Sequence, residues 1–224
     1  MENRMRSDYS KNLQALQDGL LTLGSMVDKA IHKSIQSLKD RNLQLAQTVI
    51  DEDDLIDQKR FELENSAVTL LATQSPMAAD LRFIISALHI AVELERMGDY
   101  AEGIARISQT IGEQPTLKPL IDLPKMTDLA TAMLRKSLLA YTSRDMDLAI
   151  EVCKSDDAVD SLYEDVYHEL VGFMIKDPDT VQRATYLLWV SHDVERIADR
   201  ATNIAERVIY LITGELSEID ISTY

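Results

Sequence analysis

The second half of this 224-residue chain repeats the first half, which restricts the fold to two copies of one structural unit. Shifting the sequence by 103 positions superimposes the earlier part of each half, and shifting it by 100 positions superimposes the later part. The change of shift places three extra residues in the first half, near Pro76. The superimposed pairs include Arg41 with Arg144, Asp57 with Asp160, Glu95 with Glu195, and Asp99 with Asp199.

The composition predicts that each unit is built from long helices. Hydrophobic residues make up 46% of the chain and aromatic residues only 5%, and there are few glycines and prolines, which favours helices over sheets. Helices of about 30 residues are about 45 Å long, so each half is expected to form an elongated three-helix bundle in an all-α fold. The predicted helices span residues 8–40, 43–73, 76–112, 125–143, 146–175 and 178–213.

The turn-forming residues predict the domain boundaries. Three prolines in the middle of the chain indicate a linker, and Gly112 and Gly214 are typical of helix ends. Ser75 and Asp177 each precede a proline, which predicts an N-cap followed by proline at the first helical position. The predicted parts are a first bundle at 8–112, a linker at 113–124, a second bundle at 125–214 and a tail at 215–224.

The charge and hydropathy of the chain exclude several classes of protein. Its formal net charge of −15 repels phosphate backbones, so we expect no nucleic-acid binding, but it suits divalent cations or a basic partner surface. The single cysteine, Cys153, excludes an internal disulfide and is predicted to be buried. The longest apolar run, 83–92, is half of a membrane span, and the polar N-terminus does not resemble a signal peptide. We therefore expect a cytoplasmic protein without a membrane span.

Four pairs of carboxylates occur at a spacing of four residues, which places both members of a pair on one helix face. Like charges at this spacing destabilise a helix by roughly 0.2–0.5 kcal/mol, so a counter-charge is expected. Both halves retain the pairs, and the pairs lie in line with apolar stripes, which favours a metal site over a solvated acidic face. The predicted ligands are Asp53, Asp57, Glu95 and Asp99 in the first half, and Asp156, Asp160, Glu195 and Asp199 in the second.

Arginine is the competing source of counter-charge. Arg96 and Arg196 follow the two glutamates directly, but neighbouring helical positions are about 100° apart, so we expect these arginines to be poorly placed to pair with them. Arg60 shares the apolar stripe of the second helix. His192 is a possible nitrogen ligand, and Asn203 is a possible partner that orients Asp199. Oxygen ligands suit magnesium, calcium, manganese or iron, and no ligand glutamate is followed by the histidine typical of di-iron oxidases.

Short motifs in both halves resemble those of a known family. Residues 76–82 read PMAADLR, 94–99 read LERMGD and 194–199 read VERIAD, followed by the Asn-Ile-Ala of 203–205. With the aspartate pairs, these motifs resemble the PhoU family of phosphate transport regulators over residues 10 to 213. The resemblance implies two three-helix bundles related by a pseudo-two-fold axis. It also implies clusters of iron, zinc, manganese, magnesium or calcium on the eight carboxylates named above.

The resemblance further implies a regulatory function. PhoU proteins are similar in acting as cytosolic negative regulators of the phosphate-starvation response, linking the phosphate ABC transporter ATPase to a sensor histidine kinase, and they commonly form homodimers. Asp80 and Arg82 are then a possible partner surface, which the second half lacks because it has Val181-Gln182-Arg183 there. The alternatives are a carboxylate-bridged iron-binding or redox protein and a purely structural helical module.

Overall fold

The computed structural model describes residues 2–115, 117, 120 and 122–215, with side chains described from Tyr9 onward. The described residues form six long α-helices and one turn of 3-10 helix, η1, and they contain no strand, which confirms the all-α prediction. The elements are α1 (Glu2–Asp40), α2 (Leu43–Gln74), α3 (Ala79–Ile111), α4 (Asp122–Ser143), α5 (Met146–Lys176), η1 (Pro178–Thr180) and α6 (Val181–Thr213).

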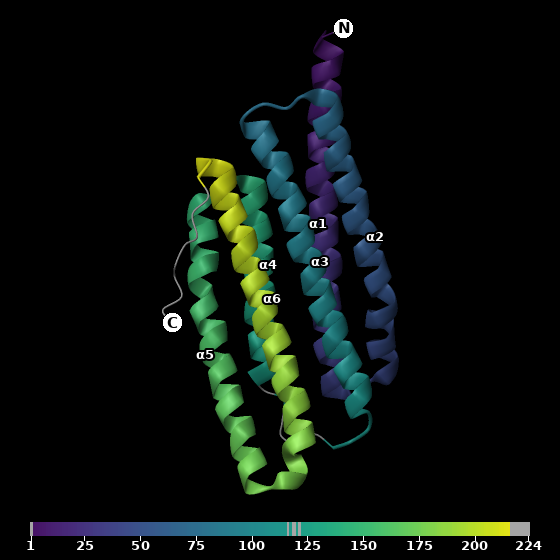
Figure 1. Cartoon of the computed structure of the whole chain (residues 1–224), viewed down its shortest axis with the longest axis vertical. Helices are drawn as coiled ribbons and strands as arrows, with labels where there is room; N and C mark the ends of the chain where they lie inside the picture. Colours follow the sequence, from purple (N-terminus) through teal and green to yellow (C-terminus); the bar gives the residue numbers. More distant parts are fainter. Residues whose placement is uncertain (1, 116, 118–119, 121, 216–224) are drawn as a thin grey trace.

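The helices form two three-helix bundles that lie side by side (Figure 1). The first contains α1, α2 and α3, and the second contains α4, α5 and α6. The bundles join along the middle of the molecule, where α3 packs against α6 and α1 against α4. α2 and α5 lie at the two outer edges, and the N-terminal end of α1 extends beyond the rest (Figure 1).

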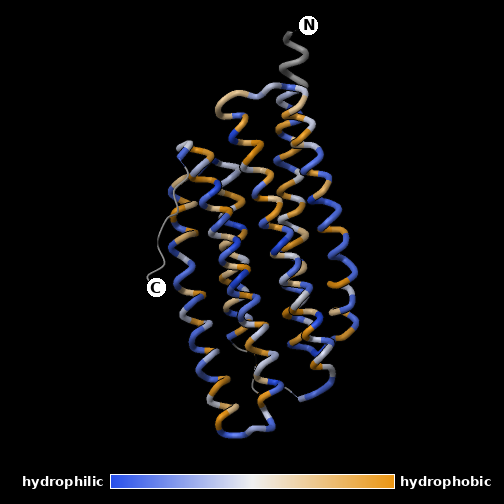
Figure 2. The backbone as a smooth tube through the Cα atoms, viewed as in Figure 1, coloured by the Kyte–Doolittle hydropathy of each residue, from blue (hydrophilic) through white to orange (hydrophobic). Residues whose placement is uncertain are grey.

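Burial follows this arrangement. α3 and α6 each contain 14 buried residues, whereas α2 and α5 each contain 6, so α3 and α6 are the central helices. Figure 2 shows hydrophobic and hydrophilic residues alternating along the helices, as expected where one face is buried and another is exposed. Cys153 is buried, as predicted. No helix among the described residues is both long and apolar enough to cross a membrane.

The duplication extends to the turn between the first two helices of each bundle. Arg41 and Arg144 both have a φ of 54°, and the residue after each is an N-cap. The Asn42 and Asp145 side chains each accept a hydrogen bond from the backbone N–H three residues later, at 3.0 Å in both cases. The same local sequence signal therefore begins α2 and α5.

The second turn of each bundle differs between the halves. Asp177 accepts a hydrogen bond from the Asp179 backbone N–H and precedes Pro178 at the first position of η1, which confirms the predicted N-cap. The equivalent prediction at Ser75 is wrong: Ser75 ends α2 with a φ of 44°, and α3 begins only at Ala79. The three extra residues of the first half lie in this turn, which is why it differs from the turn at Asp177.

Other helix boundaries differ less from the prediction. α1 begins at Glu2, before the predicted residue 8. α4 begins at Asp122 and includes Pro124, because proline is tolerated in the first turn of a helix. Gly112 and Gly214 end α3 and α6, as predicted. Of the predicted tail, only Glu215 lies within the described residues.

Candidate functional site

The eight predicted carboxylates form two acidic clusters, one on each bundle. Cluster A comprises Asp53 and Asp57 on α2 with Glu95 and Asp99 on α3. Cluster B comprises Asp156 and Asp160 on α5 with Glu195 and Asp199 on α6. In each bundle the two helices that carry a cluster pack against each other, so carboxylates separated by about 40 positions in sequence come together.

The charges within each cluster act on one another. Burial, together with the negative charges of Glu102, Asp99, Asp57 and Glu95, raises the pKa of Asp53 to about 7. In cluster B, burial followed by the charges of Asp160, Asp199 and Glu195 raises the pKa of Asp156 to about 7. Burial, together with the charge of Glu195, raises the pKa of Asp199 to about 6, although Arg196 and Arg200 oppose the shift. Both clusters are thus partly desolvated concentrations of negative charge.

Glycine brings the two helices of cluster A close together. A Cβ atom on Gly98 of α3 would lie 3.1 Å from Ile56 Cγ2 and 3.3 Å from Asp53 Oδ1 of α2. Only a residue without a side chain allows this approach without a shift of its neighbours, and the approach places the Asp53 carboxylate against α3. Ala198 occupies the equivalent position in the second half.

Arg196 lies directly on cluster B, contrary to the expectation from helical spacing. Its Nε and Nη2 atoms each donate to a Glu195 oxygen at 2.6 Å, and its Nη1 atom lies 2.8 Å from Asp199 Oδ2. The expectation was wrong because the spacing fixes only the direction of the Cβ atom, whereas the long arginine side chain can fold back. Glu195 is only 9% exposed, so its charge requires a close partner.

Cluster A obtains its counter-charge from the neighbouring helix. Arg60 Nε of α2 lies 3.4 Å from Glu95 Oε1, and Arg60 Nη1 donates to Glu64 Oε1 at 2.6 Å. Arg96, the counterpart of Arg196, is exposed and forms no ion pair within the described part of the chain. The sequence placed Arg60 on this stripe, and the structure shows which carboxylates it contacts.

Of the other two candidate residues, His192 lies near a cluster B carboxylate, whereas Asn203 contacts a different group. His192 Nδ1 is 3.6 Å from Glu195 Oε2, and its side chain is half exposed. The Asn203 amide donates to Glu93 Oε2 of α3 at 3.0 Å, so it does not orient Asp199 as hypothesised. Asn203 reaches across to the other bundle because α3 and α6 pack together, which no local pattern indicates.

The possible partner surface at the start of α3 is partly occupied by α6. Arg82 Nε donates to the Leu211 carbonyl at 3.4 Å, near the C-terminal end of α6, and the guanidinium lies next to Gly214. Asp80 lies in the first turn of α3 and is half-buried. Arg82 therefore joins the two bundles at this end of the molecule.

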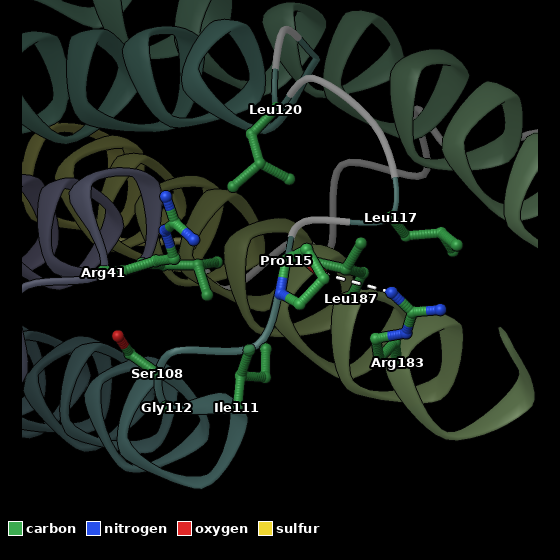
Figure 3. A pocket seen from close by; sticks show the side chains of 10 residues that line it. Arg41, Ser108, Ile111, Gly112, Pro115, Leu117, Leu120, Arg183 and Leu187 are labelled. Atoms are coloured by element: carbon green, nitrogen blue, oxygen red, sulfur yellow. Dashed lines mark hydrogen bonds between the residues drawn. The ribbon is translucent and has the colours of Figure 1, made fainter.

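A small pocket lies at the opposite end of the bundle junction, and Figure 3 shows its lining. Arg183 of α6 reaches across it and donates from Nη1 to the Pro115 carbonyl at 3.3 Å (Figure 3). The cavity volume is about 20 Å³, which is enough for about one water molecule. The pocket belongs to the junction between the bundles and is too small for a substrate.

The carboxylates of the two clusters fit a metal ion in their chemistry but not in their present arrangement. Among the described residues, no group of three or more His, Cys, Asp and Glu side chains is arranged to hold an ion as it stands. Glu195 and Asp199 instead face Arg196, and Glu95 faces Arg60. Asp156 Oδ1, however, is buried without a hydrogen-bond partner within the described structure. This buried oxygen without a partner, next to other desolvated carboxylates, fits a hard cation. To bind such an ion, Glu95 and Glu195 would have to turn away from the guanidinium groups that they now face.

Two further acidic residues were missed by the sequence analysis. Glu102 raises the pKa of Asp53 and Asp99, and its position three residues after Asp99 on the same helix face could have revealed it. Asp193 of α6 lies against Gly103 of α3, and burial raises its pKa to about 7. Its counterpart at the shift of 100 is Glu93, so the repeat itself carried a signal.

The raised acid pKa values predict an unusual pH dependence of stability. Because Asp53, Asp156, Asp193 and Asp199 bind protons more tightly in the folded chain, the free energy of unfolding falls as the pH rises from about 4 to about 7. We expect the midpoint of thermal unfolding of the metal-free chain to be about 5 °C higher at pH 5.5 than at pH 8. Circular dichroism melts in EDTA measure this difference, and a higher midpoint at pH 8 would contradict it.

Comparisons with known proteins agree with this architecture. The PhoU domain profile matches residues 20–108 and 123–208, one match in each half. The phosphate-specific transport system accessory protein PhoU homolog of Clostridium acetobutylicum is 37% identical over 216 residues, covering 96% of this chain and 99% of that protein. A second homolog, from Thermotoga maritima, is 34% identical over 206 residues, covering 92% of this chain and 88% of that protein.

Two crystal structures have the same fold. PhoU from Pseudomonas aeruginosa superimposes with a TM-score of 0.88 at 34% identity, covering 92% of this chain and all of that chain. The phosphate transport system regulatory protein PhoU from Streptococcus pneumoniae superimposes with a TM-score of 0.88 at 31% identity, covering 94% of this chain and all of that chain. With both repeats matched along nearly their full length, the chain belongs to the PhoU family.

Proposed function

We propose that this chain is a cytoplasmic, non-catalytic adaptor that acts as a negative regulator of the phosphate-starvation response. In this proposal it links the ATPase of a phosphate ABC transporter to a sensor histidine kinase and modulates phosphate uptake. The observation that carries the proposal is the match along nearly the full chain to proteins named as accessory to phosphate-specific transport. A homodimer is part of the same proposal and rests on the family resemblance alone.

The acidic character of the molecule supports a docking function. The net charge of −15 suits a partner with a basic surface, and the long outer helices α2 and α5 offer extended faces for contact. The pocket at the bundle junction has room for about one water molecule, so binding of a small-molecule substrate there is disfavoured.

We further propose that both clusters bind metal ions, with cluster A and cluster B each supplying four carboxylates. Manganese, magnesium, calcium, iron and zinc are the candidate ions, because carboxylate oxygens accommodate all of them. A bound dication would cancel the repulsion within a cluster and hold α2 against α3, or α5 against α6. The orphaned Asp156 Oδ1 atom supports this part of the proposal.

The adaptor function is tested by copurification and by gene expression. The tagged full-length chain is expected to copurify with the transporter ATPase and the histidine kinase from cells grown in high phosphate. Deletion of the gene is expected to switch on phosphate-starvation genes in the same medium. An expression profile that stays at the wild-type level after deletion, with neither partner copurifying, would contradict the proposal.

A further inference from the structure

The two clusters are alike in their carboxylates but differ in their counter-charges. In cluster A, only Glu95 forms an ion pair with a guanidinium within the described structure, and that group, on Arg60, is bound more closely to Glu64. Asp53, Asp57 and Asp99 have no salt-bridge partner within the described part of the chain. In cluster B, a single guanidinium engages both α6 carboxylates, Glu195 twice and Asp199 once, at 2.6 to 2.8 Å.

The repeat explains how this difference arose in the sequence. At the shift of 103, Arg60 corresponds to Tyr163 and Glu64 corresponds to Tyr167, so α5 lacks the ion pair that α2 carries. Burial, and then the charge of Glu195, raises the pKa of the Tyr163 phenol, and this side chain offers Glu195 no positive charge. Because Tyr163 and Tyr167 of α5 supply no positive charge, the nearly buried Glu195 pairs with Arg196, which follows it in the sequence.

The equivalent arginine of the first half behaves differently. Arg96 is exposed and unpaired within the described residues, because Arg60 already faces Glu95 from the neighbouring helix. Arg96 and Arg196 are thus a matched pair at equivalent positions, of which only Arg196 occupies its cluster.

From these contacts we infer that Arg196 is an internal counter-cation that a metal ion must displace from Glu195 and Asp199. Cluster B therefore requires a higher metal concentration than cluster A, and the two clusters bind metal one after the other, cluster A first. This inference rests on the proposed metal binding. The Arg196 side chain is 36% exposed, so its guanidinium has a path to solvent when it leaves the carboxylates.

Displacement has a direct energetic consequence. A metal ion that binds cluster B is attracted by four carboxylates, but its binding breaks three short charge-assisted contacts of Arg196. Binding of a metal ion at cluster A breaks only the 3.4 Å contact of Arg60 with Glu95, and Arg60 keeps its partner Glu64. Changes in groups that hold metal ligands typically alter metal affinity by about 10- to 100-fold. We expect cluster B to bind about tenfold more weakly than cluster A.

The inference is tested by titrating Mn²⁺ into the metal-free full-length chain and following the bound ion by electron paramagnetic resonance and calorimetry. The wild-type chain is expected to show two Mn²⁺-binding steps, one of higher and one of lower affinity. Asp53→Asn should remove the tighter step and Asp156→Asn the weaker one, which assigns each step to a cluster. Arg196→Gln should tighten the weaker step by about tenfold. Arg96→Gln is the matched control and should leave the weaker step unchanged.

A second readout needs no metal. Without Mn²⁺, Arg196→Gln should lower the midpoint of thermal unfolding because it strands the nearly buried Glu195, whereas Arg96→Gln should not. Arg196→Lys, which keeps the charge but loses the paired contact, should lie between wild type and Arg196→Gln in both readouts.

A weaker step that stays unchanged in Arg196→Gln would overturn the inference while leaving metal binding intact. The absence of any Mn²⁺ step in the wild type and all variants would overturn both the inference and the proposed metal sites. Copurification with the transporter ATPase would then still test the adaptor function separately.

Discussion

Saturating both clusters with Mn²⁺ is expected to raise the midpoint of thermal unfolding at pH 8 by roughly 10–20 °C. An ion present at 100 times its dissociation constant stabilises the folded state by about 2.7 kcal/mol per site, and 1 kcal/mol corresponds to about 2–4 °C for a chain of this size. Calorimetric melts of the EDTA-stripped chain, before and after adding Mn²⁺, measure the shift.

The matched control is the double variant Asp53→Asn with Asp156→Asn. Each substitution removes a desolvated charge from a repelling cluster, so the metal-free variant should melt higher than the metal-free wild type at pH 8. The same variant should respond little to Mn²⁺ and should lose about half of the pH dependence between pH 5.5 and pH 8, because Asp193 and Asp199 remain. A wild-type midpoint that is indifferent to chelation, in a preparation free of metal by elemental analysis, would rule out the metal sites.

Replacing Glu93 by alanine is expected to lower the free energy of unfolding by about 3 kcal/mol. Glu93 of α3 accepts from Arg200 at 3.2 Å and from Asn203 at 3.0 Å, both on α6, so it links the two bundles. The Glu93 and Arg200 side chains are each only 18% exposed, and Arg200 Nε already lacks a hydrogen-bond partner within the described structure. Removing the carboxylate would therefore leave a largely buried guanidinium without its charge partner.

Urea unfolding followed by circular dichroism measures this loss. Glu151→Ala is the control, because the Glu151 to Lys136 pair joins α5 and α4 on the exposed surface, and such pairs contribute at most about 1 kcal/mol. Similar losses in the two variants would show that the contact between α3 and α6 does not depend on this buried pair.

The sequence predicted the helices and the location of the carboxylates because both depend on local patterns. Hydrophobic spacing, the N-cap residues Asn42 and Asp145 and the terminal glycines act within one or two turns of a helix, so they can be read without knowing the fold. The repeat supplied the rest, since two copies of one unit must place equivalent carboxylates on equivalent faces. Membership of the PhoU family follows from the same motifs.

The sequence alone determined the helices and faces of the eight predicted carboxylates, although not the neighbouring Glu102, whereas only the tertiary structure decided which cation each of them faces. Arg196 folds back onto Glu195 because burial leaves that charge without solvent, and Arg60 reaches Glu95 only because α2 packs on α3. Asn203 donates a hydrogen bond to Glu93 across the contact of α3 with α6, although the two residues are 110 positions apart in the sequence. Side-chain direction and desolvation depend on neighbours that are distant in sequence, so helical spacing could not predict them.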